Sequence, residues 1–66
     1  MLIHLNGEAR RLDAPCTLAQ LLADADLAGR RVAIELNGAI VPRGRHAEHL
    51  LADGDRVEIV HALGGG

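Results

Sequence analysis

The segment TLAQLLADAD, residues 17–26, is the one stretch of the chain with the apolar spacing of an amphipathic helix. Thr17 and Gln20 lie three residues apart and match a capping box, in which each side chain bonds the other residue's backbone N–H. Gly29 supplies a stop signal after the segment. We therefore expect a single helix over residues 17–26. The apolar positions that recur at helical spacing are Leu18, Leu21, Leu22 and Ala25.

Strand patterns flank this helix on both sides. Before it, Asn6-Gly7 separates residues 2–5 from residues 9–13, and because both turn residues tolerate positive φ, we expect a hairpin. After the helix, residues 32–36 alternate as a half-buried strand does. A second Asn-Gly, at residues 37–38, then turns the chain into a short strand at residues 40–41.

The last third of the chain predicts one more strand. Pro42 ends the short strand because it has no N–H to donate, and residues 43–52 fit one helical turn or a packed loop. Asp53-Gly54-Asp55 forms a turn, after which residues 56–62 alternate apolar and charged side chains as far as the glycines.

One helix can cover only one face of one sheet, so these elements predict an α+β fold. A mixed sheet of four to five strands would wrap around the helix, and a right-handed crossover would place the last strand parallel to the first, at the middle of the sheet. This is the β-grasp layout. We expect residues 1–62 to form the domain and residues 63–66 to form a flexible tail. The expected core is Ile3, Leu5, Leu12, Leu18, Leu21, Leu22, Ile34, Leu36, Leu51, Val57 and Ile59, and the residues expected on the uncovered face are Leu2, His4, Glu58 and Val60.

Composition narrows the class of protein further. The chain has 66 residues, which is enough for one domain with a marginal core, and it is 48% hydrophobic without any aromatic residue. Its net charge of -2 and dispersed arginines do not resemble a nucleic-acid or membrane surface. A single cysteine allows no internal disulfide, and no His/Cys spacing matches a zinc site. Without a signal-like or membrane-spanning run, we expect a cytoplasmic protein, monomeric when free, with proteins as partners.

The sequence ends in HALGGG, residues 61–66, and this tail allows two interpretations. Glycine has no Cβ, so the tail could enter a narrow channel and present the carboxylate of Gly66 to another protein's active site. Such a carboxylate needs activation, commonly by adenylation, because its charge repels nucleophiles. Alternatively, the glycines form only a frayed chain end.

The whole chain resembles a ThiS-type sulfur carrier of thiamine biosynthesis, a small ubiquitin-like β-grasp protein. The matching segments are LNG at residues 5–7, the Thr17-Leu18 entry to a Leu-Leu helix, AIELNGAIVPR at residues 33–43, DGDRVEIV at residues 53–60 and the terminal Gly65-Gly66. Gly64 departs from the family pattern by lengthening the usual glycine pair to three. We expect this change to loosen the tail without altering its chemistry.

The resemblance implies that the protein is a co-substrate and not an enzyme. A ThiF-type adenylyltransferase would use ATP and Mg²⁺ to adenylate Gly66, and sulfur from a cysteine desulfurase, carried as a persulfide, would convert it to a thiocarboxylate. A ThiG-type thiazole synthase would then build this sulfur into the thiazole phosphate precursor. The carrier itself would bind no cofactor or metal. The residues implied for the tail and for partner binding are Val60, Ala62, Leu63, Gly64 and Gly65.

Three other functions remain open. The chain could be another β-grasp sulfur carrier, such as the small subunit of molybdopterin synthase, although that family tends to be longer and to contain aromatic residues. It could be a protein modifier, although its seven basic residues are all arginine, so it has no lysine on which to build chains of itself. It could also be a non-covalent binding module.

Individual side chains also allow two interpretations each. Cys16 precedes the helix cap and could relay sulfur, or could pack as a small apolar residue against Leu21. His46 and His49 could share a metal, but two ligands make a poor site and solvated surface is the better interpretation. Arg43 and Arg45 could be solubilising charge or a docking surface. Val60, Ala62 and Leu63 could end the strand by packing, or could form an apolar rim that enters a partner first; we favour the rim.

Overall fold

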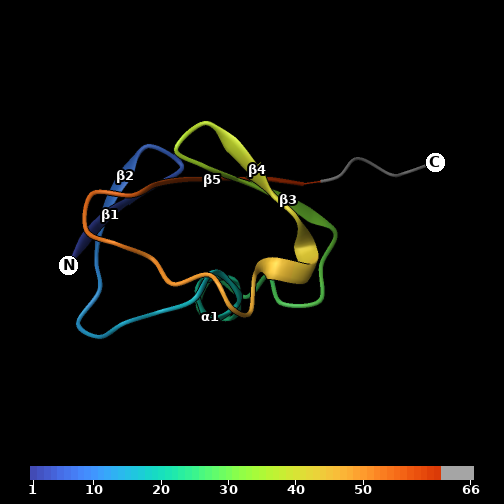
Figure 1. Ribbon diagram of the computed structural model, residues 1–66, viewed down its shortest axis with the longest axis horizontal. Coiled ribbons are helices and arrows are strands. Elements are labelled where there is room, and N and C mark those ends of the chain that lie inside the picture. The colour runs from blue at the N-terminus through green and yellow to red at the C-terminus, as the bar shows by residue number, and fades with distance from the viewer. Residues whose placement is uncertain (62–66) are drawn as a thin grey trace.

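The computed structural model describes residues 1–61 and contains one five-stranded sheet and one α-helix (Figure 1). The strand order is β2-β1-β5-β3-β4. Figure 1 shows α1 on one side of the sheet. We call the opposite side the open face, and within residues 1–61 no helix lies over it. The elements in chain order are β1 (Leu2–Leu5), β2 (Glu8–Arg11), α1 (Leu18–Asp24), β3 (Val32–Leu36), β4 (Ala39–Val41), the 3₁₀ helix η1 (Arg43–Arg45) and β5 (Arg56–His61).

The pairing of β5 confirms the predicted topology. β5 lies at the centre of the sheet, parallel to β1 and antiparallel to β3. The outer pairs, β1 with β2 and β3 with β4, are antiparallel hairpins. The result is a mixed sheet around one helix, which is the β-grasp arrangement.

Both hairpins turn at the asparagine-glycine pairs that the sequence indicated. Asn6 and Asn37 have φ of 51° and 52°, and Gly7 and Gly38 have φ of 84° and 88°. Two successive positive φ values define the hairpin turn whose twist matches the flanking strands. Both asparagines also bond β5: the Asn6 Oδ1 accepts from the N–H of Ile59 at 2.8 Å and the Asn37 Oδ1 from the N–H of Arg56 at 2.9 Å.

The start of α1 confirms the predicted capping box. The Thr17 Oγ1 accepts from the Gln20 N–H at 3.1 Å, and the Gln20 Oε1 accepts from the Thr17 N–H at 2.8 Å. The first two helical N–H groups, of Leu18 and Ala19, donate to the backbone carbonyls of His49 and His46. The segment after η1 therefore completes the cap from a distant part of the chain.

The predicted stop at Gly29 is wrong, because α1 already ends at Asp24. Asp26 takes the left-handed conformation, with φ of 60°, and its N–H donates to the carbonyl of Ala23. The N–H of Leu27 donates to the carbonyl of Leu22 at 2.7 Å. These two bonds form a Schellman motif with aspartate where glycine is usual. Gly29, with φ of 80°, lies in the turn that follows.

The core matches most of the prediction. Eight of the eleven expected residues are buried: Ile3, Leu18, Leu21, Leu22, Ile34, Leu51, Val57 and Ile59. Leu5, Leu12 and Leu36 are only partly buried and pack against this cluster from its margin. Cys16 and His46, which the prediction did not place in the core, are buried. On the open face, Leu2, His4, Glu58 and Val60 are exposed as expected.

Candidate functional site

The candidate site begins where β5 ends, because the glycines follow this strand. His61 pairs with Val32 and Val60 pairs with Ala33, so β3 runs alongside β5 up to its last described residue. Of the predicted site residues, Val60 is described and is 53% exposed. The others, Ala62, Leu63, Gly64, Gly65 and Gly66, lie outside the described residues, as does the predicted flexible tail.

Three apolar side chains form a strip on the open face beside this end of β5. Val60 lies opposite Ala33, and Ile40 lies opposite Glu35, which places Ile40 diagonal to Ala33. Ile40 is 62% exposed, a large fraction for isoleucine. We call Ile40, Ala33 and Val60 the apolar strip. A partner covering it would gain apolar burial next to the point where the tail begins.

Sequence reasoning assigned Ile40 to a short strand but not to the site. Its neighbours Ala39 and Val41 lie opposite Leu36 and Ile34, which are a margin residue and a buried residue of the core. Alternation along β4 therefore directs Ile40 to the open face. The signal was present in the sequence, since an isoleucine between two core-facing positions of an edge strand must face away from the helix.

Charged side chains occupy the middle of the open face. Glu35 and Glu58 lie directly opposite each other on β3 and β5. Together with Arg56, Asn37 and Gly38 they line a hollow. Like charges at a directly opposed pair destabilise a sheet, so the pairing adds nothing to folding. It leaves a polar area adjoining the apolar strip.

The expectation that His46 is solvated surface is wrong. His46 is only 5% exposed, and its Nε2 lies 3.0 Å from the Val41 carbonyl oxygen, to which a protonated Nε2 donates. His46 therefore joins the segment after η1 to the end of β4. His49 is half-buried. Within residues 1–61, no group of three or more His, Cys, Asp or Glu side chains is arranged to hold a metal ion.

Cys16 has the environment of a packing residue. It is buried in the cluster that contains Leu21, and its Sγ donates to the Thr17 carbonyl at 3.3 Å. Burial, followed by the negative charge of Asp24, raises the pKa of the Cys16 thiol, and Arg10 opposes this only in part. A raised pKa lowers the fraction of reactive thiolate, so this environment does not favour a sulfur relay.

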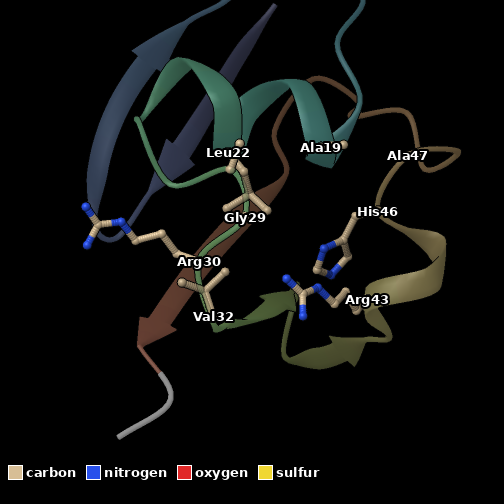
Figure 2. A pocket seen from close by; sticks show the side chains of 9 residues that line it. Ala19, Leu22, Gly29, Arg30, Val32, Arg43, His46 and Ala47 are labelled. Carbon is tan, nitrogen blue, oxygen red and sulfur yellow. The ribbon is translucent and has the colours of Figure 1, made fainter. Parts of the chain in front are cut away.

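Arg43 lies beside a cavity on the helix side of the molecule, and Figure 2 shows its guanidinium next to the ring of His46. The cavity measures about 210 Å³ and is bounded by α1, the loop before β3 and the segment around η1. Arg30 lines it from the loop before β3. Arg45 is exposed on η1 and does not line it.

A mixed five-stranded sheet around one helix, with its central strand leading to a glycine-ended tail, defines a small ubiquitin-like protein of the β-grasp class. The model of the ThiS family matches residues 3–66. The chain belongs to the ThiS family. Within residues 1–61, no helix has the length and apolar character to cross a bilayer.

Individual relatives and one solved structure agree with this membership. The chain is 42% identical to the sulfur carrier protein ThiS of Bacillus subtilis, with 98% of this chain and all of that protein covered. All 66 residues of the chain match a segment of a thiazole synthase of Magnetococcus marinus at 44% identity, and this segment is only 20% of that protein. The chain also resembles the crystal structure of the thiamine biosynthesis protein ThiS from Geobacter metallireducens. The match covers all of both chains, at 30% identity and a TM-score of 0.85.

Proposed function

We propose that the chain is a sulfur carrier of thiamine biosynthesis and that the carboxylate of Gly66 is the group that carries the sulfur. The observation that carries the proposal is membership of the ThiS family over residues 3–66, a match that includes the terminal glycines. The position of the apolar strip supports it, because the strip adjoins the end of the strand that leads to those glycines.

The chemistry takes place on the last residue and requires other proteins. A ThiF-type adenylyltransferase, using ATP and Mg²⁺, lets the Gly66 carboxylate attack the α-phosphorus of ATP, with pyrophosphate as the leaving group. The terminal sulfur of a cysteine-derived persulfide then displaces AMP from the acyl carbon to give an acyl disulfide. A thiol next cleaves the S–S bond, forming a new disulfide with the donor sulfur and releasing the acyl sulfur. The product is a thiocarboxylate, whose sulfur is more nucleophilic than the original oxygen. The folded domain contributes no catalytic group; it binds and positions the reacting carbon.

The acceptor in this proposal is a thiazole synthase, which would receive the tail and use the sulfur in forming the thiazole ring. A segment similar to the whole of this chain occurs within the thiazole synthase of Magnetococcus marinus, where it accounts for a fifth of that protein. A second thiazole synthase, from Paramagnetospirillum magneticum, contains such a segment at 41% identity. Carrier and synthase sequences joined in one protein support a direct interaction between the two functions.

The test is the intact mass of the chain after incubation with its adenylyltransferase, ATP, Mg²⁺ and a cysteine-derived sulfur source. We expect the exchange of one oxygen for one sulfur, located at Gly66 by fragmentation. A variant lacking Gly64, Gly65 and Gly66 is the control and should show no exchange, because deletion of Gly66 alone would leave a terminal glycine pair. If the wild-type chain binds its partner but stays unmodified, the chain acts as a binding module and the proposal fails.

A further inference from the structure

Four of the seven basic side chains gather at one end of the molecule. Arg30 and Arg31 directly precede β3, whereas Arg43 and Arg45 follow β4. Because β3 and β4 are antiparallel, the start of β3 and the end of β4 lie at the same end of the sheet. The pairing of Val32 with His61 places the end of β5 there too, and Figure 1 shows η1 towards the same end. We call these four arginines the basic end.

The charge of the basic end contrasts with that of the whole chain, which is -2. Asp26 and Glu48 lie in the connecting segments nearby, and two carboxylates against four guanidiniums leave an excess of positive charge. At the opposite end of β5, Asp53 and Asp55 accept backbone N–H groups of Leu2 and Ala52, and Arg11 and Arg56 lie at that end as well. The opposite end thus carries both signs of charge, whereas the basic end has an excess of positive charge.

The cavity within the basic end is suited to the side chain of a partner. Ala19, Leu22 and Val32 supply apolar walls, Arg43 supplies the positive charge, and no acidic residue in the described part of the chain lines it. Figure 2 shows Arg43 beside His46, whereas Arg30 extends from the other wall away from the cavity. A carboxylate on a short aliphatic stem matches this lining, because a guanidinium binds a carboxylate in a bidentate manner.

The backbone that presents Arg43 is held in place by three separate contacts. The ring of His46 contacts the Val41 carbonyl, Ala19 donates its N–H to the His46 carbonyl at 3.0 Å, and Leu18 donates to the His49 carbonyl at 3.1 Å. The arginine is therefore carried on a segment tied to both β4 and α1. A fixed backbone reduces the entropy lost when a partner binds.

We propose that the basic end is a docking surface for an acidic protein partner, separate from the apolar strip on the open face. This inference rests on the proposed function, in which another protein receives the tail. The partner is one whose tail-accepting opening is bordered by Asp or Glu side chains; one carboxylate enters the cavity and pairs with Arg43, while others face Arg30 and Arg31. The attraction steers the tail towards the opening and sets its orientation.

The experiment reverses charge at two arginines and measures transfer by the chain's own adenylyltransferase and thiazole synthase. Arg30→Glu/Arg43→Glu is compared with Arg11→Glu, an exposed arginine on β2 outside the basic end. At about 0.05 M salt, we expect the double variant to raise KM about tenfold or more with at least one enzyme, with kcat little changed, and the gap to shrink at about 0.5 M salt. The control should change KM less than about twofold under the same conditions.

The outcomes separate this inference from the proposed function. If wild-type protein acquires sulfur and the double variant matches it with both enzymes at low salt, the docking surface is wrong although the carrier function stands. If wild-type protein acquires no sulfur, the proposed function itself fails. Far-UV circular dichroism checks folding, and Arg30→Gln/Arg43→Gln, with an expected effect of about threefold or more at low salt, replaces the reversal if that variant does not fold.

Amide chemical shifts of the free protein test the other possible occupants of the cavity. We expect no change at Arg43 when inorganic phosphate is added, when residues 62–66 are deleted or when the protein concentration is raised. A change with phosphate would assign the cavity to a small anion, and a change on deletion would assign it to residues 62–66. A change with protein concentration would assign it to a second copy of the chain. Each of those results would overturn the proposal.

Discussion

Replacing Asn6 tests how the strand that leads to the tail is held in the sheet. β1 ends at Leu5, and beyond it the Asn6 side chain continues the contact with β5 by accepting the Ile59 N–H at 2.8 Å. Asn6 also has φ of 51°, a conformation that asparagine and glycine tolerate and alanine does not. One residue therefore supplies both a turn conformation and a hydrogen-bond acceptor, and two substitutions separate them.

The two contributions have different expected sizes. Asn6→Gly keeps the turn but leaves the Ile59 N–H without its acceptor in a residue that is only 9% exposed. Leaving such a donor unpaired costs about 1–2 kcal/mol of the free energy of unfolding. Asn6→Ala loses the same bond and adds about 1 kcal/mol for a left-handed residue with a Cβ. A chain of this size has roughly 3–10 kcal/mol of stability, so both losses are measurable.

Urea unfolding followed by far-UV circular dichroism is the appropriate assay, because a chain without Trp, Tyr or Phe has no useful intrinsic fluorescence. Asn6→Asp is the matched control, since it retains an acceptor and tolerates positive φ, and it should unfold near the wild-type midpoint. Equal midpoints for Asn6→Gly and wild type would refute the role of the Asn6–Ile59 bond. Equal midpoints for the glycine and alanine variants would refute the conformational part.

Three further changes test other regions. Asp26→Gly removes a left-handed aspartate from the end of α1 and should raise the free energy of unfolding by about 0.5–1 kcal/mol, whereas a lower urea midpoint would contradict its place in the Schellman motif. Ile40→Asp should reduce thiocarboxylate formation at least about tenfold with folding unchanged. Leu2→Asp, on the open face away from the apolar strip, should leave it unchanged. Equal effects would show that the apolar strip is not a contact surface for the partner. Burial and Asp24 raise the pKa of Cys16 in the folded chain, so the unfolded chain loses the thiol proton at lower pH. The free energy of unfolding should therefore fall as pH rises from about 7 to about 10, as urea unfolding at several pH values would measure. The same fall in Cys16→Ala would exclude the thiol as its source.

Much of the fold was predictable because its signals are local. The two Asn-Gly turns and the capping box of α1 each depend on residues within four positions of one another, and each has the predicted geometry. The end of α1 was not predictable from glycine, because the left-handed position is occupied by Asp26. The strand pattern placed Val60 on the open face, as the structure has it, but the position of Ile40 beside Ala33 depends on the register of β3 and β4.

His46 shows most clearly where local reasoning fails. In the sequence it is one polar residue in an arginine-rich segment, with nothing to distinguish it from surface. In the fold it is buried, because the end of β4 supplies a carbonyl for its ring and α1 donates an N–H to its backbone carbonyl. These contacts require β4 and α1, which lie next to the His46 segment only in the folded chain.

The sequence by itself determined the two Asn-Gly turns, the start of the helix and, for most strand residues, the face that they present to the core. These depend on backbone preferences and on side-chain periodicity, which act between near neighbours. Only the tertiary structure decided that the apolar strip adjoins the end of β5, that four arginines share one end and that His46 lies inside. The physical reason is that strand register and helix packing bring residues 30–45 next to residue 61, and no interaction between sequence neighbours specifies that contact.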